Sequence, residues 1–205
     1  MDSINKLTEL FKEFPGVGPR QARRFVYYLI SRRHASLTDF TRLILSLKRE
    51  TKKCQTCFRY FLNASNTQDL CQICADSTRD YKFLMIVARD IDLETIEKSH
   101  AFGGFYFVLG GTVPILQTNP EKLINIVELI AILKKRAVDG LKEIIVATSL
   151  NPEGENTFDY VTKIITSIST KHGIKISGLG RGLSTGTELE YSDADTIKNA
   201  LKNRS

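Results

Sequence analysis

Four cysteines, which are all the cysteines of the 205-residue chain, form two pairs with the same internal spacing. Two residues separate Cys54 from Cys57, two separate Cys71 from Cys74, and thirteen lie between the pairs. Two such pairs can present four thiolates to one tetrahedral ion, and the pattern is typical of zinc. Because four thiolates leave no open coordination position, we expect one structural Zn²⁺ per chain that activates no water.

The segment between the two pairs, residues 58–70, is too polar to bury much surface. We therefore expect metal binding to supply most of the folding free energy of a small inserted zinc module. Two disulfides, or four unrelated thiols, are the alternative interpretation. A reducing cytoplasm disfavours both disulfides.

A glycine-rich turn, Phe14-Pro15-Gly16-Val17-Gly18-Pro19, is the second candidate site. Its two glycines, Gly16 and Gly18, permit a tight turn with exposed backbone amides, and the helix that follows points its N-terminus at the same place. A phosphate could bind there, with side-chain contacts from three arginines: Arg20, Arg23 and Arg24. Such contacts give affinity for a nucleic-acid backbone without reading base sequence. A plain connector between two helices is the alternative, which the flanking arginines disfavour.

The remaining residues that could do chemistry form no recognisable catalytic group. His34, His100 and His172 are scattered, with no serine or cysteine nucleophile beside them, and we interpret them as structural or surface residues. The glycine-rich run 178–186 lacks the lysine of a phosphate-binding loop, so we interpret it as a flexible loop.

Positive charge is concentrated at the start of the chain. Residues 1–53 hold 12 Lys and Arg against 5 Asp and Glu, a net charge of +7 in a chain whose total is +6. A densely anionic partner would bind this part, although a solvated basic face is the simpler alternative. No apolar run is long enough to cross a bilayer, and the amphipathic N-terminus is unlike a signal peptide, so we expect a cytoplasmic protein without a membrane partner.

The periodicity of apolar residues changes along the chain. Steps of three and four residues predict helices over residues 4–14, 20–33 and 38–53. After the cysteines, short apolar runs predict strands at 82–88, 105–109, 143–148 and 174–178. Helical segments alternate with them at 93–98, 123–136, 158–170 and 193–202. This alternation is typical of a mostly parallel sheet covered by helices on both faces.

In this order of parts the whole chain resembles the RecR family of bacterial recombination mediators. The resemblance rests on the hairpin FPGVGPRQARRF, the cysteine quartet ending in CQICAD, and three further segments: VLGGTVPI, NPEGENT and RGLSTGTELEYSD. It implies an α+β / α/β protein of four modules. These are a helix-hairpin-helix DNA-binding region (1–53), a four-cysteine zinc finger (54–78), a Toprim domain (79–178), and a C-terminal Gly-rich loop and helix (179–205).

The resemblance also implies a function and partners. The expected role is that of a non-enzymatic mediator of recombinational DNA repair, which loads recombinase on single-stranded DNA coated by single-strand-binding protein. Its partners would be double- and single-stranded DNA, bound without sequence specificity, a RecO-like protein and possibly a RecF-like protein. The family forms homo-oligomers, dimers or tetrameric rings, in which residues matching Arg20 and Arg24 line a hole for DNA. Three C-terminal residues are candidates to bridge protomers: Arg181, Glu188 and Tyr191.

One departure from the family bears on enzymatic activity. Toprim enzymes usually carry a Glu-Glu pair after the first strand, where this chain has Ala88 and Arg89. The alternative function is a Toprim-type Mg²⁺-dependent nuclease or primase-like enzyme that would recruit Asp90 and Asp92, with Glu153 or Glu155, as metal ligands. A third hypothesis is a zinc-containing scaffold whose basic face binds an acidic protein and never DNA.

Overall fold

The computed structural model describes residues 2–63, 69–180, 182–183, 186 and 188–202. Its contacts divide the chain into two compact units. The first comprises Met1–Lys52 with Leu62–Asn66, and the second comprises Lys53–Phe61 with Thr67–Ser205. The cysteine-bearing segment thus belongs mainly to the second unit. The four-module division from the sequence remains a prediction.

The first unit consists of three helices: α1 (Ser3–Lys12), α2 (Pro19–Ile30) and α3 (His34–Glu50). The first two form a hairpin around a small apolar core. Ala22 and Val26 of α2 are fully buried, and the rings of Phe11 and Phe25 meet edge to face with centroids 5.7 Å apart. This packing fixes the angle at which the turn between α1 and α2 is presented.

Helix α3 buries none of its side chains against the described part of the chain. Four apolar residues at helical spacing are each about half exposed: Phe40, Leu43, Ile44 and Leu47. A monomeric soluble protein rarely exposes a contiguous apolar stripe of this kind. The stripe is therefore an exposed apolar surface of α3 within the part of the chain that the structure describes.

The cysteine-bearing segment contains short elements only. A two-stranded sheet joins β1 (Thr51–Lys53) to β2 (Tyr60–Leu62), and a single helical turn, α4 (Gln72–Ala75), carries the second cysteine pair. We call residues 53–61 and 69–76 the cysteine module. Its backbone is held by local bonds, in which the amide of Cys54 donates to the carbonyl of Arg59 and that of Gln55 to the carbonyl of Asp69.

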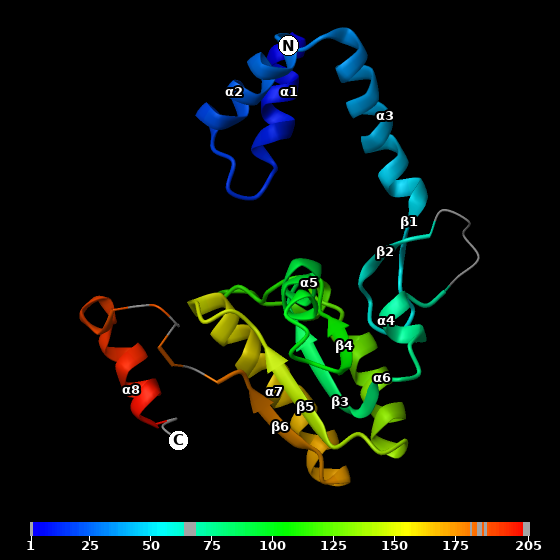
Figure 1. The fold of residues 1–205 in the computed structure, drawn as a ribbon, viewed down its shortest axis with the longest axis vertical. Coiled ribbons are helices and arrows are strands. Elements are labelled where there is room, and N and C mark those ends of the chain that lie inside the picture. Colours follow the sequence, from blue (N-terminus) through cyan, green and yellow to red (C-terminus); the bar gives the residue numbers. More distant parts are fainter. Residues whose placement is uncertain (1, 64–68, 181, 184–185, 187, 203–205) are drawn as a thin grey trace. The chain divides into compact units, whose positions relative to one another are not determined.

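A four-stranded parallel sheet forms the centre of the second unit (Figure 1). Its strands are β3 (Asp80–Val87), β4 (Gly104–Val108), β5 (Glu143–Ala147) and β6 (Lys175–Gly178), in the order β4-β3-β5-β6. Crossover helices α5 (Asp90–Lys98), α6 (Ile126–Val138) and α7 (Pro152–His172) connect the strands. Each apolar strand is too short to bury its faces alone, so the helices must cover them.

Two apolar clusters lie on the two faces of this sheet. On one face, Leu84 and Ile86 of β3 pack with Leu129 and Leu133 of α6 and with residues of α7. On the other face, residues of the same strands pack against α5 and against the cysteine module. The module is therefore part of the core and not an isolated insertion.

The C-terminal part of the chain holds a short 3₁₀ turn, η2 (Leu189–Tyr191), and helix α8 (Ala194–Lys202). A second such turn, η1 (Pro120–Lys122), precedes α6. Among the helices that the structure describes, none is both long and apolar enough to span a membrane.

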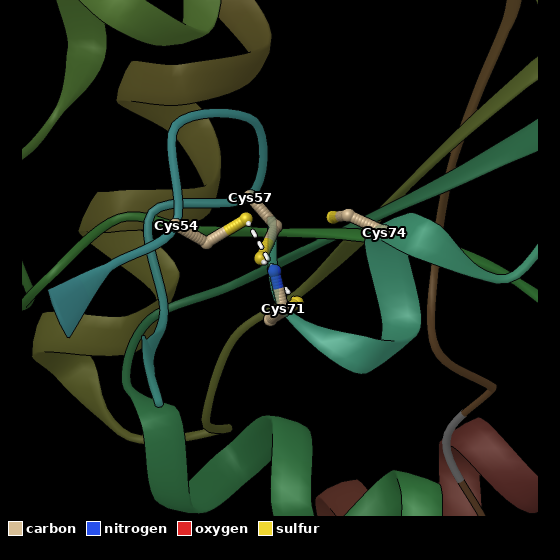
Figure 2. A group of neighbouring side chains, drawn as sticks. All are labelled: Cys54, Cys57, Cys71 and Cys74. Carbon is tan, nitrogen blue, oxygen red and sulfur yellow. Dashed lines mark hydrogen bonds between the residues drawn. The ribbon is translucent and has the colours of Figure 1, made fainter. Parts of the chain in front are cut away.

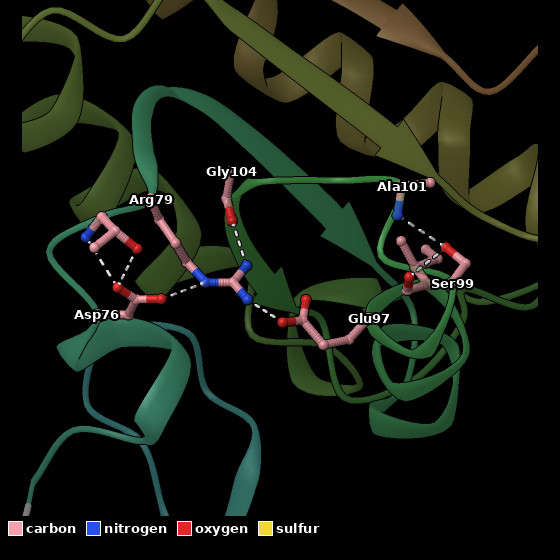
Figure 3. Close-up of polar contacts among 8 residues, drawn as sticks. Asp76, Arg79, Glu97, Ser99, Ala101 and Gly104 are labelled. Atoms are coloured by element: carbon pink, nitrogen blue, oxygen red, sulfur yellow. Dashed lines mark hydrogen bonds and ion pairs between the residues drawn. The ribbon is translucent and has the colours of Figure 1, made fainter.

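A partly buried arginine joins the end of the cysteine module to the sheet (Figure 3). The Arg79 guanidinium forms an ion pair with Glu97 of α5, donates to the carbonyl of Gly104 at 2.9 Å, and lies 3.7 Å from the Asp76 carboxylate. The hydroxyl of Tyr106 is buried in the same group, and burial together with Glu97 raises its pKa. Ion pairs and a hydrogen bond of Arg79 therefore fasten the cysteine module to the sheet, in addition to the covalent chain.

The predicted fold class is confirmed, while the boundaries of several elements differ from the prediction. Helix α7 begins at Pro152, six residues before the predicted start, because Asn151 caps it by accepting from the Gly154 amide at 2.8 Å. Helix α3 begins at His34, and residues 51–53 form β1 instead of ending that helix. The elements β2 and α4 were not predicted, since neither is long enough to show a period.

Replacement of Arg79 by Met should lower the free energy of unfolding by about 2 kcal/mol, since the hydrogen bonds of a mostly buried charge are lost while the apolar stem remains. Urea denaturation measures the change. The matched control is Lys98→Met, which removes an exposed ion pair with Glu94 and should change stability by about 0.5 kcal/mol or less. Equal effects of the two variants would contradict a special role for Arg79.

Candidate metal centre and nucleic-acid interface

The four cysteines come together in one cluster (Figure 2). All four sulfur atoms lie within 4.8 Å of one another, and those of Cys57 and Cys71 are 3.6 Å apart. Thiolates bound to one tetrahedral zinc ion at about 2.3 Å lie about 3.8 Å from each other. The side chains thus converge at a spacing that suits one ion, and the cluster can hold a metal.

The thiols are almost removed from water. Cys54, Cys57 and Cys71 are at most 1% exposed, and Cys74 is partly buried. Hydrogen bonds from Cys57 and the other thiols lower the pKa of Cys54, whereas the bond to Cys54 raises the pKa of Cys57. Crowded thiols cannot all ionise without a cation among them, so metal binding must displace their protons.

The position of this cluster is set by the edge strand of the sheet. The amide of Val108 in β4 donates to the carbonyl of Cys57 at 2.8 Å. Phe58, whose φ of 63° is left-handed, places its ring 5.3 Å from that of Phe107. Burial of the module against the sheet therefore adds to the free energy that a bound metal would supply. That the metal supplies most of it stays a prediction.

The turn between α1 and α2 has the geometry that an anion needs. Gly16 has a φ of 77°, and Gly18 caps the N-terminus of α2 without any side-chain hydrogen bond. A Cβ added at either glycine would meet open space. The first amides of α2 therefore face an open position at the positive end of the helix dipole.

The three predicted arginines surround this turn at the start of α2. Arg20, Arg23 and Arg24 are all exposed. Arg24 donates to the Gln21 side chain at 3.4 Å, and no carboxylate within the described ranges pairs with Arg20 or Arg23. Three cations without counter-charges, beside unbonded amides, make a surface suited to a phosphate backbone.

The acidic residues invoked for a Toprim enzyme are already engaged. The carboxylate of Asp90 accepts from the amide of Tyr60 at 2.8 Å, and that of Asp92 accepts from the amide of Arg89 at 2.9 Å to cap α5. Glu153 accepts from the Thr112 hydroxyl at 3.1 Å. These side chains hold loops and helix ends, which weakens the enzyme hypothesis.

The positions that replace the family's acidic pair differ from each other in exposure. Ala88 is 2% exposed and Arg89 is exposed, at the carboxyl end of β3. His34, His100 and His172 are also exposed, as expected for surface residues. Of the proposed protomer-bridging residues, Glu188 and Tyr191 are exposed and Arg181 lies outside the described residues.

Polar contacts on the sheet side of the cluster were not predicted from the sequence. Lys53 donates to the side chain of Asn125 at 2.9 Å, and Asn125 in turn donates to the carbonyl of Val108. Arg136 of α6 is 4% exposed. A signal for Arg136 existed, because it occupies an apolar position of α6 that follows Leu129 and Leu133 at helical spacing.

Comparison with known proteins gives matches over the whole chain. A family model described as the Toprim domain matches residues 82–179, and one described as RecR, C-terminal matches residues 182–205. Recombination protein RecR of Limosilactobacillus reuteri (strain DSM 20016) is 35% identical over 204 residues, covering 99% of this chain and 96% of that protein. The proteins of the same name from Anaplasma phagocytophilum (strain HZ) and Ligilactobacillus salivarius (strain UCC118) are 35% and 32% identical. They cover 98% and 99% of this chain, and 97% and 96% of their own lengths.

Replacement of Cys57 by Ser should abolish retention of metal, measured as metal per chain after gel filtration, because three thiolates with a hydroxyl bind far more weakly. It should also expose the module to proteolysis. Thr56→Ala is the matched control in the same loop and should keep the metal. Undiminished metal content in Cys57→Ser would contradict a four-thiolate site.

Replacement of Asp92 by Ala should cost about 1 kcal/mol of stability through loss of the cap of α5. Neither this variant nor the wild type should cleave DNA or synthesise primers with Mg²⁺ or Mn²⁺. Asp159→Ala, at an exposed position within α7, is the control and should leave stability nearly unchanged. Metal-dependent activity that disappears in Asp92→Ala would support the enzyme hypothesis instead.

Proposed function

The chain belongs to the RecR family of recombination proteins, and from this premise we propose that it is a non-enzymatic mediator that grips DNA by its backbone. In this role it acts in the cytoplasm during recombinational repair, with a RecO-like protein and possibly a RecF-like protein. Its task is to help load recombinase on single-stranded DNA coated by single-strand-binding protein. The observation that carries the proposal is the open turn at Gly16 and Gly18, followed by exposed arginines that pair with no carboxylate of the described residues.

In this proposal the turn binds phosphates of either double- or single-stranded DNA. The amides at the start of α2 would bond to phosphate oxygens, and Arg20, Arg23 and Arg24 would neutralise neighbouring phosphates. None of these groups reads a base edge, so binding is independent of sequence. This suits a mediator that must act wherever DNA is damaged.

The metal in the proposal is one structural Zn²⁺ per chain, held by the four cysteines. The donor set supports it, since four thiolates at a tetrahedral spacing are the preferred environment of structural zinc. With all positions filled by protein, the ion supplies folding free energy and no catalysis.

The proposal includes a homo-oligomer, either a dimer or a tetrameric ring. The exposed apolar stripe of α3 supports it, because burial against a second copy would remove that surface from water. Glu188 and Tyr191 are further exposed candidates for contact between protomers. A closed ring would place several copies of the turn around one DNA molecule.

In the proposal, the RecO-like partner docks on the Toprim domain at the carboxyl end of β3, as the resemblance to the family implies. This edge carries the exposed Arg89 where the family carries an acid. The matching point on the partner should therefore be neutral or acidic here, since a like charge would be repelled.

The double variant Arg20→Ala with Arg24→Ala tests the DNA contacts. Duplex affinity is measured across a salt series, together with molar mass by light scattering. The slope of log affinity against log salt concentration is negative, and its magnitude should decrease by about 2 for each hairpin that binds DNA. The molar mass should not change.

The matched control is Lys163→Ala with Lys171→Ala, which removes the same charge from exposed positions of α7. It should bind as the wild type does. Tight binding by the folded arginine variant would remove the hairpin from the mechanism. A wild type indifferent to both duplex and single strands would favour a scaffold for an acidic protein.

A further inference from the structure

Arg136 is a buried cation whose partner is not evident from the protein alone. It is 4% exposed on the inner side of α6, and its guanidinium contacts two aromatic rings that meet edge to face. The guanidinium carbon is 4.5 Å from the ring centres of both Tyr81 and Phe105. Contact with the two rings stabilises the cation without accepting a hydrogen bond from its N–H groups.

At least one of those N–H groups has no acceptor. Nη1 of Arg136 is shielded from solvent and makes no hydrogen bond, and no carboxylate in the described ranges forms an ion pair with this residue. Burial of a charge without an ion-pair partner is unfavourable, and contact with two rings offsets only part of that cost. The Asp139 carboxylate, at the C-cap of α6, acts on Arg136 through its charge but forms no ion pair with it, so a directly paired counter-charge is missing among the described residues.

A cavity of about 340 Å³ joins Arg136 to the cysteine module. Cys74 lines it together with Gln55 and Thr56 of the module, and Lys135 adds a second cation from α6. No carboxylate lines this cavity among the residues that the structure describes. Burial lowers the pKa of Arg136, and the charge of Asp139 opposes that shift.

The module would supply the missing charge once it holds its metal. Four thiolates around a divalent cation have a formal net charge of −2, carried mainly on the sulfur atoms. Metal–thiolate centres need hydrogen-bond donors or cations around them, and such groups tune metal affinity. Arg136 and Lys135 are the cations that share a cavity with one of the four ligands.

We propose that Arg136 is the counter-cation of the metal–thiolate centre, a positioning residue on α6 that stabilises the bound ion and fastens the module to the domain. The inference rests on the proposed zinc site. It explains why a charged side chain occupies an apolar position of a core helix. It also makes the metal part of the stability of the Toprim domain, because without the ion Arg136 is a buried charge with no directly paired counter-charge.

The test compares Arg136→Leu with Arg136→Lys, and takes Lys134→Met, an exposed position of α6, as the control. Zinc affinity of the full chain is measured by competition with a chromophoric chelator, and urea unfolding is measured with and without zinc. Arg136→Leu should lose about 10- to 100-fold in zinc affinity. Arg136→Lys keeps the charge and should lose less than about tenfold, while Lys134→Met should match the wild type.

The unfolding data separate this role from simple packing. In the proposal, removal of zinc destabilises the wild type more than Arg136→Leu, because only the wild type is left with an uncompensated charge. Unchanged zinc affinity in Arg136→Leu, with equal destabilisation of both forms, would overturn it.

If Arg136→Leu does not fold, the test depends on the zinc affinity of Arg136→Lys. A loss of tenfold or more in that affinity overturns the inference. A wild type that binds no zinc would instead refute the zinc site itself.

Discussion

The contact between the cysteine module and the edge strand β4 is the constraint on which the rest of the second unit depends. A parallel edge strand offers unpaired amides and carbonyls, and all five residues of β4 are buried. The carbonyl of Cys57 satisfies the amide of Val108, so the module takes the place of a fifth strand at this point. The same bond fixes one metal ligand relative to the sheet. Coverage of the edge and assembly of the cluster are therefore one structural event.

Charged side chains fasten the module at both ends of this contact. Arg79 ties its last residues to α5 and β4, and Asp90 holds the amide of Tyr60 from the start of α5. Asp90 lies at the edge where Toprim enzymes bind metal, yet here it serves as a structural acceptor. The chain thus has the Toprim fold, while Asp90 and Asp92 bind backbone amides of the cysteine module and of the start of α5. This use agrees with membership in a family of recombination mediators.

Local patterns predicted much of this structure. The cysteine spacing predicted the cluster because each pair lies within one short turn, and the alternation of apolar runs predicted the parallel sheet. The start of α7 was missed because Asn151 and Pro152 are capping signals, which apolar periodicity does not contain. The helical spacing of Arg136 after Leu129 and Leu133 indicates an inward position, but its contacts with Tyr81 and Phe105 could not be predicted, since these rings come from two separate strands. The DNA-binding turn was predicted as a geometry, and its role remains a proposal.

The order of these parts along the chain has a consequence for biosynthesis. All four cysteines precede Gly104, where β4 begins, so they leave the ribosome before the strand that will cover them. During that interval the thiols are exposed to solvent, and a metal ion is the partner that can hold them in register. In a chain that binds its metal ion early, the cysteine module is already folded when β4 emerges and can pair with that strand at once. Metal supply should thus influence the yield of folded protein, as well as its stability once made.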